Sequence, residues 1–368
     1  MSTPTTLSPR ALGRATLARQ LLLRREASPV VTAVERLGGL QAQLARPPHI
    51  SLWSRLVDHT RDALNAALHR RELVRATFLR GTLHIVSAAD FLAHRAALQP
   101  LLDRAIRSIL KDRADRLDIP TLLADARRHL AVAPRTFEAL RDLLSAGVPD
   151  SDERAMGFVV RCMLPLVQVP TDAPWGFPGA AEFAAAEPWL NQPLATDPDP
   201  RPLIRRYLAA YGPASVADAQ TWTGLKSLRP VFEALRPELL SLRDERKREL
   251  FDLPGAPQPD PDTPAPPRFL PDFDSLVLAH DDRARLIDDA HRPAIYLSKN
   301  LRVLPTFLLD GRVAGTWSCE RKKAAATLTL TPFAALSKPA RSALDPEAHA
   351  LLRFLEPDAS TFDLRVSD

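Results

Sequence analysis

The spacing of apolar residues along the first 86 positions predicts three short helices followed by a β-hairpin. A Ser or Thr precedes each apolar run with helical spacing, at Ser8, Ser28 and Thr60. Residues 73–86 are rich in β-formers and are interrupted at Arg80 and Gly81, which is typical of a hairpin. Three helices closed by a hairpin are the outline of a winged helix-turn-helix, so residues 1–86 form the first predicted unit.

The same outline returns further along the chain. A long helix is predicted from Ser87 to about residue 109, and helices at 120–131 and 136–145 complete a helical or winged-helix unit over 87–200. Residues 201–253 contain three more helix patterns, the second capped by Ser215. Two β-rich runs at 239–243 and 249–252 then flank a charged turn. Residues 201–253 are therefore the third predicted winged helix.

The C-terminal part has a different pattern. Residues 254–267 are dense in proline and predict a linker. Beyond them, Asp310 and Gly311 join two apolar runs, a strong hairpin signal, and an amphipathic helix is predicted over 345–356. We expect residues 268–368 to form a β-rich subdomain with a hairpin, which makes the fold class α+β.

Composition narrows the class of protein. No apolar run approaches the roughly 18 residues that a membrane span needs, and the N-terminus lacks an apolar signal core. Cys162 and Cys319 are the only cysteines and lie near no cluster with metal spacing. We therefore expect a cytoplasmic protein without membrane contact, bound metal or cofactor.

The positive charge is concentrated at the start of the chain. Residues 1–80 hold 13 arginines against five acidic residues, while the formal net charge of the whole chain is only +5. One interpretation is a surface for a polyanion. The other is ordinary helix surfaces in an arginine-rich protein.

The chain lacks the familiar catalytic motifs but carries an unusual pair of glutamines. There is no phosphate-binding glycine loop, no Gly-x-Ser-x-Gly and no His-Glu-x-x-His. Gly38 and Gly39 end a helix, and Gln41 and Gln43 follow one residue apart. In an extended segment both carboxamides would point the same way. The plain alternative for this pair is a surface turn.

Candidate DNA contacts surround this pair. Arg46 and His49 follow it closely, and Arg80, Thr82 and His84 form a second group at the hairpin. An arginine in such a turn can meet a phosphate or enter the minor groove. The alternative is that Arg80 is only a turn residue and that His84 is a satisfied strand residue.

Several blocks of the sequence resemble the AlkZ/YcaQ-type DNA glycosylases, in order and in spacing across nearly the whole chain. They are Gly39 to Gln43, Phe78 to His84, Gly212 to Ser215 with Trp222 to Leu225, Leu270 to Asp274 with His280 to Arg283, and Leu309 to Trp317. The resemblance implies three tandem winged helix-turn-helix units in a C-shape around duplex DNA, with the C-terminal β-rich subdomain. It also implies excision of alkylated bases. Its double-glutamine branch is associated with interstrand crosslinks from genotoxic natural products and with self-resistance.

The resemblance places the catalytic motif on Gln41 and Gln43. An N7-alkylated guanine is cationic and leaves without a general acid, so Gln43 is expected to hold a water at C1′ while Gln41 orients water or ligand. Ala42 is smaller than the central residue expected, which leaves the adduct open. An open surface that reaches the sugar from outside suits a crosslinked base and predicts no deep aromatic base pocket.

The remaining expectations concern partners. Arg312, beside the Asp310–Gly311 turn, is expected to probe the minor groove. No lysine lies near Gln41 in the sequence, so a monofunctional enzyme is predicted. We expect a monomer that binds double-stranded DNA in the nucleoid. The main rival is a winged-helix transcription regulator whose glutamines read adenine edges. A third possibility is a catalytically silent member that only sequesters drug or lesion.

Overall fold

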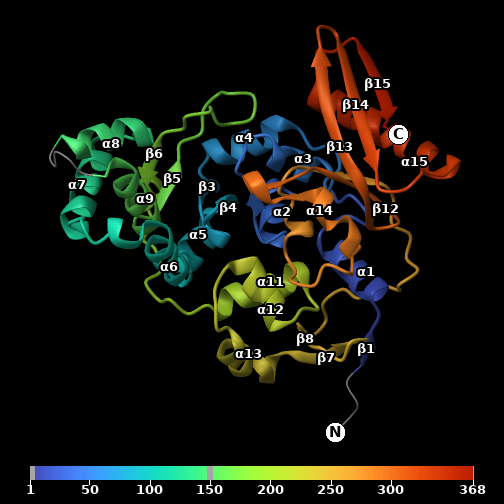
Figure 1. The fold of residues 1–368 in the computed structure, drawn as a ribbon, viewed down its shortest axis with the longest axis horizontal. Helices are drawn as coiled ribbons and strands as arrows, with labels where there is room; N and C mark the ends of the chain where they lie inside the picture. The colour runs from blue at the N-terminus through green and yellow to red at the C-terminus, as the bar shows by residue number, and fades with distance from the viewer. Residues whose placement is uncertain (1–4, 147–151, 368) are drawn as a thin grey trace.

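A computed structural model describes residues 5–146 and 152–367 and confirms a mixed α+β architecture (Figure 1). Its N-terminal part contains α1 (Pro9–Arg19), α2 (Val30–Arg36), α4 (Arg61–His69) and the antiparallel hairpin of β3 (Leu73–Thr77) and β4 (Leu83–Ser87). Ser8 and Thr60 cap α1 and α4 by accepting a backbone N–H, as predicted. Ser28 does not cap α2, because the helix begins one residue later, after Pro29. No helix in the described ranges is long and apolar enough to cross a membrane.

Two helices differ from the sequence prediction. An additional helix, α3 (Pro47–Trp53), starts with two prolines, which the first turn tolerates because its N–H groups are free there. The long helix predicted from Ser87 is divided into α5 (Ala88–His94), a 3₁₀ turn and α6 (Gln99–Leu110). Pro100 lacks the N–H that a continuous helix would need at this position.

The central sheet combines segments from two predicted units. Its strand order is β2-β4-β3-β5-β6, with β2 at Leu40–Gln41, β5 at Leu166–Gln168 and β6 at Phe183–Ala185. All neighbouring strands are antiparallel. The predicted boundary between residues 86 and 87 stays a prediction, and it runs through this shared sheet.

The helices of the second predicted unit have a core of their own. They are α7 (Ile119–Val132), α8 (Phe137–Ser145) and α9 (Glu153–Met163), whereas the short α10 (Ala186–Leu190) packs into the cluster that contains Phe78 and Trp222. Leu140, Met156 and Val160 are among the buried residues of that core. Helices α7 to α9 lie at the left of Figure 1, on the opposite side from the C-terminal sheet.

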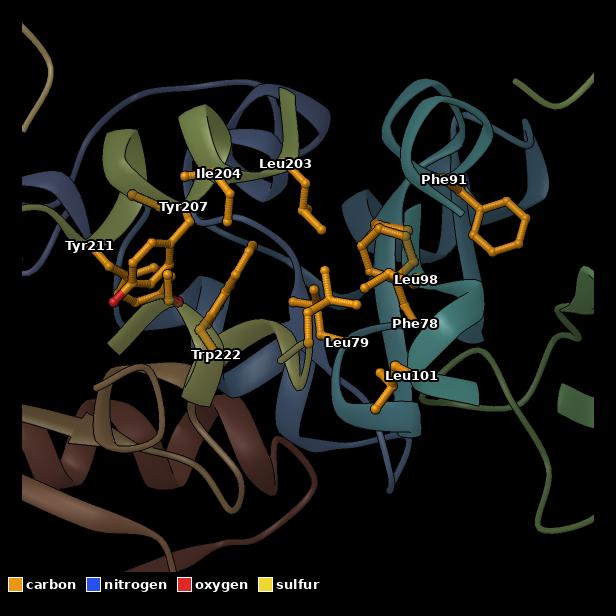
Figure 2. Close-up of a cluster of buried hydrophobic side chains, with 14 of the residues drawn as sticks. Phe78, Leu79, Phe91, Leu98, Leu101, Leu203, Ile204, Tyr207, Tyr211 and Trp222 are labelled. Carbon is orange, nitrogen blue, oxygen red and sulfur yellow. The ribbon is translucent and has the colours of Figure 1, made fainter. Parts of the chain in front are cut away.

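The third predicted unit packs against the β3–β4 turn. It contains α11 (Arg201–Tyr211), α12 (Val216–Thr223), α13 (Arg229–Leu235) and the hairpin of β7 (Leu240–Asp244) and β8 (Glu249–Asp252). The short β1 (Thr6–Leu7) adds a parallel strand to β7. Figure 2 shows Tyr207, Tyr211 and Trp222 in the same cluster as Phe78 and Leu79. The β3–β4 turn is therefore anchored in a core and is not a free wing.

The C-terminal subdomain is built on a five-stranded sheet of order β15-β14-β13-β12-β9. The strands are β9 (Arg268–Leu270), β12 (Thr306–Leu309), β13 (Arg312–Lys322), β14 (Ala325–Pro332) and β15 (Thr361–Val366). Between β9 and β12 lie α14 (Arg292–Ile295), β10 (Tyr296–Leu297) and β11 (Arg302–Val303). The predicted hairpin at Asp310 and Gly311 is confirmed. Helix α15 (Lys338–Leu355) begins earlier than residue 345, because Ser337 caps it.

Two fully buried ion pairs join distant parts of the chain. Arg19 makes a two-point contact with Asp252, at 2.7 and 2.8 Å. Arg55 does the same with Asp274, at 2.8 and 2.9 Å, and Ser51 donates to the same carboxylate. The side chains in both pairs are at most 1% exposed. These contacts fix the N-terminal helices against the third unit and the C-terminal subdomain.

Breaking the Arg55–Asp274 pair on one side should destabilise the protein strongly. We expect Arg55→Met or Asp274→Asn to lower the free energy of unfolding by about 3 to 5 kcal/mol, because the remaining charge stays buried without a partner. The free energy of unfolding of the double variant should fall by less than the sum of the two single losses. Chemical denaturation measures all three, and Arg70→Ala at an exposed pair is the control that should leave stability unchanged. Additive losses in the double variant would contradict the coupling.

Candidate active site

The two glycines after α2 set the position of the glutamine segment. Gly38 and Gly39 have φ values of +70° and +91°, so the chain leaves α2 and turns directly into β2. A Cβ on Gly39 would lie 2.7 Å from Val86 Cγ1, which leaves no room for a larger residue. The prediction that this glycine pair ends a helix is confirmed.

The side chain of Gln41 is fixed by a hydrogen bond from an arginine. The residue is only 8% exposed, and its side-chain Oε1 accepts a hydrogen bond from Arg80 Nη2 at 2.7 Å. Because a guanidinium only donates, this contact fixes which end of the carboxamide is the oxygen. The amide nitrogen of Gln41 has no hydrogen-bond partner among residues 5–146 and 152–367.

Gln43 is exposed and is anchored through its oxygen. Its Oε1 accepts a hydrogen bond from the backbone N–H of Leu83 at 2.9 Å. Both carboxamides thus turn toward the segment 80–83, as strand alternation predicted. Within the described part of the chain the Gln43 amide nitrogen also lacks a partner. Gln43 therefore offers two N–H donors and the second lone pair of its oxygen to an incoming molecule.

Arg75 fixes the backbone of the same segment. Its Nε donates to the carbonyl oxygen of Ala42 at 2.8 Å, and its Nη2 donates to that of Gln43 at 3.3 Å. The guanidinium lies over the Phe177 ring, 4.8 Å from its centroid. Burial lowers the pKa of Arg75 to about 10, so the group stays charged at neutral pH. Ala42 is fully buried, and its N–H donates to Leu83 at 2.7 Å.

Sequence reasoning missed Arg75, because nothing in the run of β3 distinguishes a buried arginine from an exposed one. It also gave Arg80 a different task. The Arg80 guanidinium donates to the backbone oxygen of Trp222 at 2.7 Å as well as to Gln41, and burial lowers its pKa to about 10. The group is turned into the protein between β2 and α12. Arg80 thus positions Gln41 in this structure, and its contact with a phosphate stays a prediction.

His49 and His84, two further predicted DNA contacts, also lie inside the protein, and their contact with DNA stays a prediction. His49 and His84 are both fully buried, so neither ring reaches a DNA surface in this structure. His49 Nε2 lies 3.3 Å from the Trp175 carbonyl oxygen, and His84 Nδ1 lies 3.0 Å from that of Thr82. Burial lowers the pKa of each imidazole to about 3, so both are neutral near pH 7.

The other predicted contacts are placed as follows. Arg46 is half-buried, with Nη2 3.8 Å from Glu356, and Thr82 is half-buried with its hydroxyl bonded to Leu79. Their contact with DNA stays a prediction. Arg312 donates to Ala284 and pairs with Asp288.

The turn beside Arg312 is packed on α1. Arg14 donates to the backbone oxygen of Asp310 at 2.9 Å, and a Cβ on Gly311 would overlap Leu17. The turn is thus not a free tip, and the minor-groove role of Arg312 stays a prediction. In the described ranges no group of three or more His, Cys, Asp or Glu side chains is placed to hold a metal ion.

Removing the Arg75 clamp should loosen the glutamine segment. We expect Arg75→Met to raise backbone hydrogen exchange at residues 41–45, because two carbonyl contacts are lost, and Arg75→Lys to restore part of the protection. Arg95→Met is a matched control, since Arg95 is equally buried and donates to the Cys162 carbonyl at 2.8 Å in the second unit. Mass spectrometry of exchange measures this. Equal exchange of residues 41–45 in both Met variants would refute the clamp.

The buried histidines should make the fold sensitive to acid. With folded pKa values of about 3 for His49 and His84, the unfolded chain binds more protons below its own pKa of about 6.5, so stability falls as the pH drops below that value. The loss at pH 5 is at most about 2 kcal/mol for each ring. Denaturation of wild type and His84→Gln at pH 7.5 and 5 measures it. The variant should show a smaller drop, and an identical drop would count against a buried neutral His84.

Comparison with known proteins identifies the family of this chain. The chain is 25% identical over 358 residues to the interstrand DNA cross-link repair glycosylase of Streptomyces sahachiroi, covering 92% of this chain and 94% of that protein. The solved structure of the Streptomyces sahachiroi DNA glycosylase AlkZ has the same fold. It matches with a TM-score of 0.79 at 21% identity, over 99% of this chain and 100% of that one. The family model described as DNA glycosylase AlkZ-like matches residues 34–354. The chain therefore belongs to the AlkZ-like family of DNA glycosylases.

Proposed function

We propose that this DNA glycosylase hydrolyses the N-glycosidic bond of N7-alkylated guanine in duplex DNA, including guanines crosslinked by genotoxic natural products. The observation that carries the proposal is the exposed Gln43 carboxamide. The backbone N–H of Leu83 donates to the side-chain oxygen of Gln43, and the Arg75 guanidinium donates to its backbone oxygen. The similarity to an interstrand DNA cross-link repair glycosylase of Streptomyces sahachiroi supports the substrate class.

The chemistry of this substrate suits a carboxamide. Alkylation at N7 puts a positive charge on the base, and cleavage of the C1′–N9 bond returns the electron pair to the base and neutralises it. No general acid is then needed for departure. The enzyme then has to place a water at C1′ and to stabilise the developing oxocarbenium ion.

We assign the placing of water to Gln43. The free lone pair of its Oε1 accepts a hydrogen bond from the water, whose oxygen forms the new bond to C1′ and whose proton passes to solvent. Its amide N–H groups donate to a sugar or phosphate oxygen. A carboxamide is a weak base, so its contribution is positioning. The side-chain oxygen of Gln41 already accepts a hydrogen bond from Arg80. Gln41 therefore acts mainly through its amide N–H donors, which orient the water or the lesion.

We also propose a partner, an oligomeric state and a cellular location. The protein acts on double-stranded DNA as a monomer in the nucleoid, and the reaction needs no cofactor. The rival role of a winged-helix regulator is not favoured, because the chain belongs to a glycosylase family.

Replacing Gln43 tests the proposal. We expect Gln43→Ala to slow release of N7-methylguanine from duplex DNA by about 10²-fold or more under single-turnover conditions, because the water is no longer held. Gln43→Glu should retain more activity than Gln43→Ala, since a carboxylate also accepts from Leu83 and from water. Heating in mild alkali converts each abasic site into a strand break that gels resolve.

The controls separate catalysis from folding and from lyase chemistry. Gln192→Ala changes an exposed glutamine and should excise at the wild-type rate. Breaks that appear without alkali would contradict a monofunctional enzyme. Excision by Gln43→Ala at the wild-type rate would remove Gln43 from the mechanism, and DNA binding without excision by wild type would favour the regulator.

A further inference from the structure

A cavity of about 450 Å³ lies between the glutamine segment and the C-terminal sheet. Leu44 and Arg46, which follow Gln43 by one and three residues, form one side of it. Residues 316–319 of β13 form another side. Because consecutive Cα atoms are about 3.8 Å apart, the cavity begins within a residue's length of the exposed Gln43. Sequence reasoning did not find this space, since its walls come from segments about 270 residues apart.

The walls combine apolar and polar side chains, and the polar ones include Thr316, Ser318 and Thr331. Ile50, Pro305 and Trp317 are buried apolar residues of the lining, and the Trp317 indole N–H already donates to Leu270 at 2.9 Å. At the rim, Asp272 and Arg302 are paired at 2.9 Å. A pocket of this size that combines apolar walls with polar groups is typical of a site for a small organic group.

Arg46 supplies a guanidinium with no close hydrogen-bond acceptor among the described residues. Its Nε and Nη2 are buried atoms with no hydrogen-bond acceptor in the described ranges. The nearest carboxylate, Glu356, is 3.8 Å from Nη2, and the guanidinium lies 5.6 Å from the centre of the Trp175 ring. The Arg46 side chain is nevertheless 34% exposed, so the accessible part of its guanidinium can donate to an oxygen acceptor of a ligand in the cavity.

We propose that this cavity receives the organic group attached to N7 of the lesion guanine, and that it selects an uncharged, largely apolar group carrying a carbonyl-type oxygen. The inference rests on the proposed function and names the substrate class of that same site. Arg302 is paired with Asp272 and Arg46 lies 3.8 Å from Glu356, so the charges at the lining balance and an uncharged substituent is favoured. N7 lies on the major-groove edge of guanine, so that edge turns toward the cavity.

A different occupant would have different consequences. If the guanine base itself entered the cavity, every N7-alkylguanine would depend on it, the methylated base included. If the substituent enters, a methyl group leaves the cavity unused. The two cases are separable by comparing lesions that share a base and differ only in the group on N7.

Three duplexes with a single lesion provide the test: N7-methylguanine, N7-(2-phenylethyl)guanine and N7-phenacylguanine. The last two differ only by a carbonyl oxygen. We expect wild type to release the phenacyl base fastest relative to the methyl base. Ser318→Trp, which fills the cavity from its exposed rim, should lower the ratio of phenacyl to methyl excision at least tenfold. Ser108→Trp, at an exposed site on α6, is the matched control and should leave the ratio unchanged.

Arg46→Met tests the hydrogen bond. It should bring the phenacyl and phenylethyl rates together, a loss of about tenfold or more in their ratio, as expected for a bond to a charged donor. The ratio is independent of any loss of DNA affinity that the substitution also causes. An unchanged ratio would exclude Arg46 as the donor.

The remaining outcomes decide between the two proposals. Equal losses for all three lesions in Ser318→Trp would place the base in the cavity, and no loss for any would remove the cavity from lesion binding. If wild type releases none of the three bases, the proposed function fails. In that case the affinities of the same duplexes for wild type and Ser318→Trp, measured by fluorescence anisotropy, still decide the occupant.

Discussion

The glutamine segment depends on two arginines whose charges are held inside the protein. Arg75 donates to backbone oxygens of the segment, and Arg80 links Gln41 to the backbone of Trp222. Burying such an ion costs several kcal/mol, which its acceptors offset only when all of them are in place together. Trp222 belongs to the core that joins α11 and α12 to the β3–β4 turn, shown in Figure 2. The geometry of the segment is therefore a property of the packed units together and does not arise from the segment alone.

This burial changes the meaning of the positive N-terminal charge. Arg14, Arg19, Arg55 and Arg75 are each at most 5% exposed, and all of them bind acceptors within the protein. A count of 13 arginines in residues 1–80 pointed to a polyanion, yet these four serve the fold. A charge count cannot separate a solvated arginine from a buried one, because that distinction depends on residues far away in the chain. Contact with phosphates has to be argued from exposed side chains one at a time.

Local signals predicted most of the elements, and non-local packing decided the rest. Ser8, Thr60 and Ser215 cap helices as expected, because a cap needs only a side chain and the next three N–H groups. The glycine pair before β2 and the turn at Asp310 were predictable for the same reason. The burial and orientation of His49, His84 and Arg80 were not predictable, because each depends on a partner or a neighbouring element that the fold brings near. At the site, the sequence therefore predicted where the glutamine segment begins and did not predict which way the neighbouring side chains face.

The placement of Gln43 beside a cavity bears on how such an enzyme selects its substrate. A cationic N7-alkylguanine is already a good leaving group, so a weak, well-positioned carboxamide is sufficient for the chemical step. Selectivity must then come from binding. A deep pocket for an extruded base is of little use against a guanine tied to the opposite strand, since that base cannot swing freely out of the duplex. A cavity that takes the attached group while the base stays near the helix avoids this difficulty. Under the proposed function, a rigid segment with one fixed geometry would serve adducts of different sizes: the variable part of the lesion would lie beyond Leu44, in the cavity, while the sugar would meet the same Gln43 each time.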